Sequence, residues 1–431
     1  MDNPAPPTPL LSSVLGFAIS LIVLVCFYMV RPREERGWLF RLALGAFLIK
    51  AILVPLYFWW LVSIGNFGFA YFDARGHHEE GINIAEEITY DLPEYTWGWR
   101  ARDSGFYKLT AYTYMLFGPN TLIIRFFLIM CISVSLLYVY RITKLYADER
   151  TARFAAGLQA FLPFPILLSL NHRKDPLVQL IVLFMFYHSV KVFRQEPGWM
   201  RSAAFTAMGL IAVYPFRSGL ILPFIGVMVI CFVLANRNVV QGMAVTIVTV
   251  MALLTFQLAI PDDSKVNLDT YGNRVEATLE GSARLADAGG LTSLLRVTGL
   301  TDIYKIPFAA AVYLILPYPP EFRVDAIGSL STSLNLFTVF FLPHLLIGVW
   351  SLIRAPNWRA NLPLLVFPFV FLLVLGAVHI GVIRYKQIFF PVCLIWTAIG
   401  WQIGASFQFK FLIYGGLFSL GSAIYLFRYL M

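Results

Sequence analysis

The chain is short of charge. Asp, Glu, Lys and Arg make up 13% of its 431 residues, whereas soluble domains use roughly 25%. Hydrophobic residues make up 59%, and the mean hydropathy is +0.72. This composition excludes a disordered, fibrous or nucleic-acid-binding protein. The net charge of +9 is expected to report topology, because Lys and Arg mark the cytoplasmic loops of membrane proteins.

Cysteines are equally few. The four residues lie far apart in apolar runs without a CxxC spacing: Cys26, Cys131, Cys231 and Cys393. We expect them to be small buried hydrophobes, with no disulfide and no metal knuckle. The first residues, MDNPAPPTPLL, also lack the basic region and cleavage site of a signal peptide. The first apolar segment is therefore expected to remain as a span.

Long apolar runs, in contrast, fill the chain. A span needs about 20 mostly apolar residues. The candidates are 10–30, 38–63, 121–140, 153–170, 176–193, 203–217, 219–236, 239–260, 329–353, 361–382, 387–404 and 411–428. The prediction is an all-α integral membrane protein with roughly 11–13 transmembrane helices. The short stretch Phe308–Pro320 ends in PYPP and is more typical of a re-entrant or interfacial helix.

Basic residues mark every second connection between these spans. They are Arg31, Arg33, Arg36 and Arg41, then Arg141, Lys144, Arg150 and Arg153, then Lys191, Arg194 and Arg201, then Arg237, then Arg354 and Arg359, then Lys410. The positive-inside rule assigns these connections to the cytoplasm. It places both termini on the outer side, with the two long polar segments, 64–120 and 261–328.

The outer segment 64–120 carries the densest chemistry, beginning with Asp73 just beyond the second span. On a helix, Asp73, His77 and Glu80 share one face. A carboxylate at the membrane edge suits a general base. The neighbouring side chains suit substrate contacts or a divalent metal: His77, His78, Glu79 and Glu80. The alternative for this cluster is a solvated amphipathic helix, with Ile82, Ile84, Ala85 and Ile88 as its apolar face.

A second outer connection, SLNHRKDPL, is very short and holds four polar residues: His172, Arg173, Lys174 and Asp175. Arg and Lys beside a helix start, with Pro176 in its first turn, suit a phosphate group. His172 and Asp175 are further candidates for a substrate or metal contact. The alternative is a plain hydrophilic cap between two spans, but basic residues on an outer loop run against the positive-inside tendency, which favours a function.

Further outer-facing cations are Arg217 in YPFRSGL and Arg384 with Lys386 in GVIRYKQIFFP. Ionisable groups at membrane depth are costly and usually mark a pathway or a ligand; snorkelling to headgroups is the alternative. Taken together, these cations and Asp73 predict an outer-face site for a lipid-linked anionic substrate, with the phosphate on Arg and Lys and the sugar near Asp73.

The order of these features resembles the GT-C class of polytopic glycosyltransferases, which includes protein mannosyltransferases and lipid A aminoarabinose transferases. The resemblance covers roughly residues 38–195 and rests on YFDARGHH, GFYKLTAYTYMLFGPNTLIIR, RITKLYADERTARFAAGLQAFLPF and NHRKDPLVQLIVLFMFY. It implies that Asp73 is the base that deprotonates an acceptor hydroxyl. It also implies a polyprenyl-phosphate sugar donor and a lipid, glycan or protein acceptor. The chain lacks a DxD or ExD pair at Asp73, so no cofactor follows beyond a possible divalent metal ion.

On this basis the chain divides into four parts. Residues 1–37 add an N-terminal span and a cytoplasmic turn, and residues 38–260 form the GT-C-like module. Residues 261–328 form an outer polar segment, and residues 329–431 form the C-terminal helices. We expect a multi-pass protein of a bacterial plasma membrane whose site faces the periplasm or exterior.

Two alternatives remain open. A transporter or flippase of lipid-linked glycans needs the same outer cations, but it often shows internal repeats and polar residues near the bilayer midplane, and no repeat is evident here. A glycan polymerase or ligase shares the substrate class, but its key groups are expected in a large loop of the second half.

Overall fold

The structure is a computed structural model of the chain, and it describes residues 9–70, 72–90, 104–235, 304–308, 328–378 and 383–404, with a few positions from 310 to 416. Every regular element among these residues is a helix. The chain divides into two compact units, which are described separately. The first holds Met1–His188, Ala204–Leu220 and Asp325–Leu330, and the second holds the remainder. The all-α class is confirmed.

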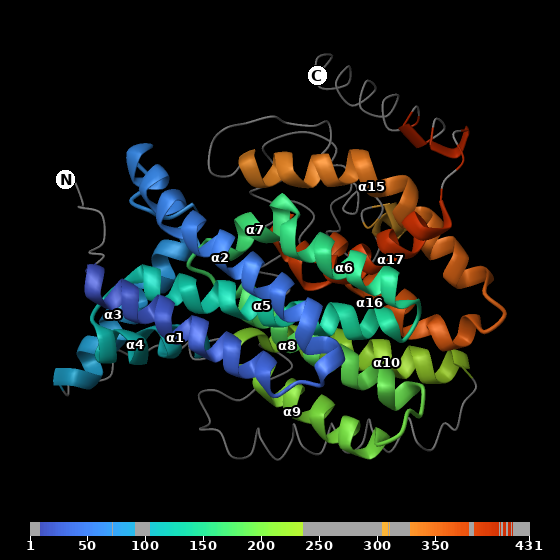
Figure 1. Cartoon of the computed structure of the whole chain (residues 1–431), viewed down its shortest axis with the longest axis horizontal. Coiled ribbons are helices and arrows are strands. Elements are labelled where there is room, and N and C mark those ends of the chain that lie inside the picture. Colours follow the sequence, from blue (N-terminus) through green and yellow to red (C-terminus); the bar gives the residue numbers. More distant parts are fainter. Residues whose placement is uncertain are drawn as a thin grey trace. The chain divides into compact units, whose positions relative to one another are not determined.

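The first unit is built from the helices of the N-terminal half. These are α1 (Leu10–Met29), α2 (Arg33–Ser63), α3 (Phe72–Tyr90), α4 (Gly105–Phe117), α5 (Thr121–Lys144), α6 (Glu149–Phe161), α7 (Pro163–Ser169), most of α8 (Asp175–Phe193), most of α9 (Trp199–Arg217) and the 3-10 turn η1 (Ser218–Leu220). In Figure 1, α3 and α4 lie together at the left of the view, at the end of the unit where α1 begins.

Five helical runs among the described residues are long and apolar enough to cross a membrane: α1, Glu35–Ser63 of α2, α5, α8 and the continuous run Trp199–Ala235. The last joins α9, η1 and α10 (Ile221–Ala235), where the sequence predicted two spans separated near Arg217. The predicted span 239–260 lies outside the described residues, as do most of 308–320 and 411–428.

The predicted span 153–170 is not one straight helix. It is the pair α6 and α7, bent by 50°. Pro163 is the cause, because proline has no N–H for the helix and forces the preceding residue out of the helical region. Leu162 accordingly has extended backbone angles, φ −63° and ψ 139°. The buried Lys50 of α2 donates its Nζ to the Ala160 carbonyl beside this break, at 3.1 Å.

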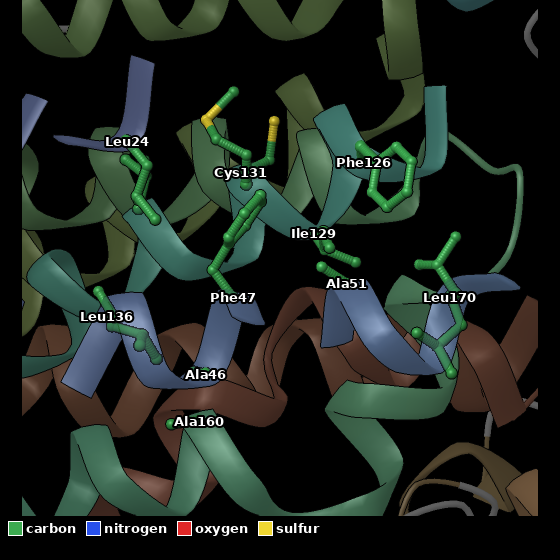
Figure 2. Close-up of a cluster of buried hydrophobic side chains, with 14 of the residues drawn as sticks. Leu24, Ala46, Phe47, Ala51, Phe126, Ile129, Cys131, Leu136, Ala160 and Leu170 are labelled. Carbon is green, nitrogen blue, oxygen red and sulfur yellow. The ribbon is translucent and has the colours of Figure 1, made fainter. Parts of the chain in front are cut away.

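Helix α5 is the centre of the first unit and packs against α1, α2 and α6. Figure 2 shows the apolar cluster that joins them, with Phe47 and Ala51 of α2 beside Phe126 and Ile129 of α5. Side chains on the other faces of α1 and α2, such as Ile22, Ile52 and Leu56, are exposed. Lipid is as apolar as these residues, so such faces suit a bilayer and the helices are held by close packing.

Polar contacts align the helix ends. Asn120 caps α5 by accepting from the Leu122 N–H at 3.0 Å, and its Nδ2 lies 2.8 Å from Ser12 Oγ and 2.9 Å from Ser13 Oγ in α1. The starts of α1 and α5 therefore lie together. At the far end of α5, Arg141 pairs bidentately with Glu35 at 2.8 and 2.6 Å. The basic connections of this unit after α1 and after α5 thus lie at the end opposite to α3 and α4.

The second unit includes α10, most of α15 (Gly328–Arg354), η4 (Trp358–Asn361), α16 (Leu362–Val378), η5 (Ile383–Ile388) and α17 (Phe390–Ile403). Helices α15 and α17 cross closely at two glycines. A Cβ at Gly348 would lie 1.9 Å from the Trp396 carbonyl, and one at Gly400 would lie 1.8 Å from the His344 carbonyl. Small residues allow such backbone contact between membrane helices.

Candidate functional site

Segments that are far apart in sequence meet at one end of the first unit. They are the turn after α2, the starts of α3, α4 and α5, the connection 170–174, the start of α8 and the end of α9. Ring contacts of His172 show this convergence: its centroid lies 6.4 Å from that of Phe69, 6.1 Å from that of His78 and 5.6 Å from that of Phe106. A Cβ at Gly105 would lie 2.9 Å from Pro215 of α9.

Asp73 stands in the first turn of α3, and its side chain is exposed. An acidic group is favourable there, because the N-terminal end of a helix carries partial positive charge. Its backbone carbonyl accepts a hydrogen bond from Nδ1 of His77 one turn later. The predicted helix is confirmed, but exposure differs along its shared face, since His77 is buried and Glu80 is half-buried.

His77 links Asp73 to the basic connection. Its ring stacks on that of Tyr107 with centroids 4.9 Å apart. Burial and the charge of Lys174 lower the pKa of His77 to about 4, although the hydrogen bond to Asp73 and the charge of Asp73 act to raise it. The imidazole is therefore neutral at pH 7. Because Nδ1 donates to a carbonyl, the proton is on Nδ1 and the lone pair is on Nε2.

His78 and His172 lie deeper, between α3, α4 and the connection before α8. The Nδ1 atom of His78 is 2.7 Å from the Tyr114 hydroxyl. Burial, with the positive charge of Arg125, lowers the pKa of His78 to about 4. Burial also holds the pKa of His172 well below its usual range. The histidines are thus packed neutral groups, unlike those of a solvated surface helix.

Asp175 joins two arginines. Its carboxylate lies 2.8 Å from Arg173 Nη2 and 2.9 Å from Arg217 Nη1, and both Arg173 and Asp175 are nearly fully buried. One carboxylate cannot neutralise two guanidinium groups, so the trio has a net charge of one positive unit, and Lys174 adds a second. Paired guanidinium groups suit phosphate oxygens, which they bind with charge-assisted hydrogen bonds.

The remaining predicted site residues have other surroundings. Glu79 pairs with Arg75 at 2.6 Å on the exposed face of α3. Lys386 is buried in the second unit, and the side chain of Arg384 lies outside the described residues. Within the described part of the chain, no group of three or more His, Cys, Asp or Glu side chains is arranged to hold a metal ion.

Arg125 was not predicted as a site residue. It lies one turn into α5, is fully buried, and has Tyr57, Tyr114, His78 and His172 within electrostatic range. The signal that marks it in sequence is a single charge near the start of the apolar run TLIIRFFLIMC. A lone charge at membrane depth favours a functional role.

The fold is similar to that of GT-C membrane glycosyltransferases, as the resemblance predicted. Two comparisons support it. Residues 106–260 match the family model of dolichyl-phosphate-mannose-protein mannosyltransferases. The structure is similar to the archaeal oligosaccharyltransferase AglB from Archaeoglobus fulgidus, solved with an inhibitory peptide and a dolichol-phosphate, with a TM-score of 0.52 and 15% identity.

That alignment covers 86% of this chain and 51% of AglB, so the chain spans about half the length of that protein. At this identity the likeness concerns the fold. A search of curated proteins by sequence found no significant match. The family match begins at Phe106 in α4 and includes Arg173, Asp175 and Arg217, whereas α3 with Asp73 lies before it.

Proposed function

We propose that this protein transfers a sugar from a polyprenyl-phosphate-linked donor to a lipid, glycan or protein acceptor at the outer face of the membrane. The observation that carries the proposal is that His77, one turn after the exposed Asp73, contacts the ring of Phe106, which in turn contacts His172, the neighbour of Arg173. A base and a phosphate-binding group are thereby held within one site.

The cations suit the donor phosphate. As the bond between the anomeric carbon and the phosphate oxygen breaks, negative charge grows on the leaving phosphate. Positive groups fixed beforehand stabilise that charge without reorganisation. Asp175 fixes Arg173 and Arg217 through its two short contacts. Lys174 is half-buried beside them and adds a second donor group.

Asp73 suits the acceptor. The acceptor hydroxyl attacks the anomeric carbon, the carboxylate of Asp73 takes the hydroxyl proton, and the phosphate leaves with the bonding electron pair. Asp73 is exposed, so an acceptor that arrives from solution can reach its carboxylate.

The comparisons support the substrate class. The matched family is named for a dolichyl-phosphate-mannose donor and a protein acceptor. AglB was solved with a peptide and a dolichol-phosphate. A polyprenyl-phosphate donor is consistent with both of these descriptions and with the cluster of Arg173, Asp175 and Arg217. Neither comparison identifies the sugar or the acceptor of this protein.

The test is complementation of a deletion strain at matched expression, with mass spectrometry of its lipid-linked and surface glycans. We expect wild type to restore the glycan and Asp73→Asn to leave the acceptor one sugar short, and the missing mass then identifies the sugar. Glu86→Gln is the matched control, because Glu86 is an exposed carboxylate of the same helix. Full restoration by Asp73→Asn would exclude Asp73 as the base.

A further inference from the structure

Arg125 is a buried cation with an unusual set of partners. Its Nη2 donates to the backbone carbonyl of Gly68 at 2.5 Å, and its guanidinium lies over the rings of Phe58 and Phe69, 5.2 and 5.7 Å from their centroids. In the described part of the chain it has no carboxylate partner. Burying an unpaired charge is costly, so this arginine is expected to have a specific role.

The partner of Arg125 is the turn that leads from α2 into α3. This turn has positive φ at Gly65 (+80°), Phe67 (+50°) and Gly68 (+81°). A Cβ at Gly68 would lie 2.2 Å from the ring of Phe58. The backbone at Gly68 is therefore confined between the Phe58 ring and the Arg125 guanidinium. Helix α3 begins four residues later, and Asp73 is in its first turn.

We propose that Arg125 is a positioning residue for Asp73. By holding the Gly68 carbonyl it fixes the turn that determines where α3 begins, and so where the Asp73 carboxylate lies. The inference rests on the proposed function, in which Asp73 is the base. A hydrogen bond from a charged donor is stronger than a neutral one, and no water competes for it at a fully buried position. The aromatic rings on the guanidinium offset part of its desolvation.

The first experiment separates positioning from direct chemistry by a double-mutant cycle. Arg125→Gln is expected to lower kcat about 100-fold, the effect of a displacement near 1 Å, with little change in the donor KM. Loss of a general base costs roughly 10²–10⁴-fold and leaves a residual rate. In the Asp73→Asn background, Arg125→Gln should slow this residual rate no further. Equal slowing in both backgrounds would overturn the proposal.

The control is Arg141→Gln, which removes an arginine from the other end of the same helix, where it pairs with Glu35. It is expected to lower stability but to leave kcat unchanged. A loss of kcat equal to that of Arg125→Gln would mean that any arginine removed from α5 has this effect, and would overturn the proposal.

A second pair of variants tests the turn without changing charge. Gly65 and Gly68 both have positive φ, so alanine strains both, but only at Gly68 does the added Cβ meet the Phe58 ring; at Gly65 nothing lies within 4 Å. We expect Gly68→Ala to lower kcat as Arg125→Gln does, and Gly65→Ala to have a much smaller effect. Equal effects would contradict the proposal. This pair decides the question if Arg125→Gln fails to fold.

Hydrogen exchange gives a readout that is independent of activity. Peptides that cover residues 64–74 should exchange faster in Arg125→Gln than in wild type or Arg141→Gln. Unchanged exchange would overturn the positioning role. A failure of the proposed function has a different signature, since Asp73→Asn would then be fully active while the exchange difference persisted.

Discussion

At the scale of single residues, Asp175 controls the arrangement of the cations. Two arginines from different elements share its carboxylate, and the Asp175 and Arg173 side chains are only 5% and 4% exposed. In such a buried cluster, removal of the Asp175 carboxylate takes one ion pair from each arginine. Surface pairs behave differently, because water screens them.

We therefore predict that Asp175→Asn lowers the free energy of unfolding by about 3 kcal/mol, as expected when a buried pair loses one partner. It should also weaken donor binding, since the two guanidinium groups then repel each other. The comparison is Glu196→Gln, which breaks the half-exposed pair with Arg194 and should cost less than about 1 kcal/mol. Thermal unfolding in detergent measures both, and equal shifts would contradict the prediction.

Most residues of the site could be predicted from the sequence one by one, but their contacts with one another could not. Residue type and position beside a span were sufficient to suggest Asp73, Arg173 and Arg217. That Asp175 bridges the two arginines depends on the approach of α8 and α9, which no local pattern encodes. Arg125 was overlooked because it lies within an apolar run whose hydropathy hides a single charge.

At the scale of elements, the contact between α3 and α4 contains the two neutral histidines of α3. His77 contacts Phe106 and Tyr107, and His78 contacts Tyr114. Both histidines have a pKa lowered to about 4 from the ordinary 6.5. In the unfolded chain each binds a proton near the ordinary value, so unfolding takes up protons below pH 6.5.

The unfolding free energy should accordingly be constant above pH 7 and fall as the pH is lowered from 6.5 to 4. The loss at the lower end is about 3 kcal/mol per histidine, from the size of the pKa shift. His78→Gln should remove the part of this pH dependence of the unfolding free energy that His78 contributes. Denaturation of the purified protein at a series of pH values tests it, and an unaltered slope in His78→Gln would show that His78 is not buried in its neutral form.

Helices were predicted well because a segment that crosses a membrane has to form the hydrogen bonds of its backbone N–H and C=O groups within itself, and an α-helix does so. Hydropathy therefore gave the spans of α1, α2, α5 and α8 within a few residues. The candidate span 153–170 corresponds to the bent pair α6 and α7, and hydropathy could not predict the bend because it does not register the backbone effect of Pro163. The pairing of α3 with α4 also could not be predicted, since an amphipathic face does not specify its partner.

At the scale of the whole molecule, the distribution of charge sets the orientation in the membrane. In the first unit, the exposed Arg150 and the Arg141–Glu35 pair lie at one end of α5, and Asp73, Arg173 and Arg217 lie at the other. The positive-inside rule applies to short loops and predicts a cytoplasmic position for the first end. Arg173 and Arg217 are exceptions, and their ion pairs with Asp175 favour a role other than topology.

The prediction is that the site end faces the exterior. In a cysteine-free variant, a single cysteine at the exposed Lys108 of α4 should react with a membrane-impermeant maleimide on intact cells. A cysteine at the exposed Arg150 of α6 should react only after the membrane is permeabilised. Three of the four native cysteines are buried, whereas Cys26 in α1 is exposed, so Cys26 in particular has to be replaced before labelling. The reverse labelling pattern would place the site in the cytoplasm, where a donor carried on the outer leaflet does not reach it.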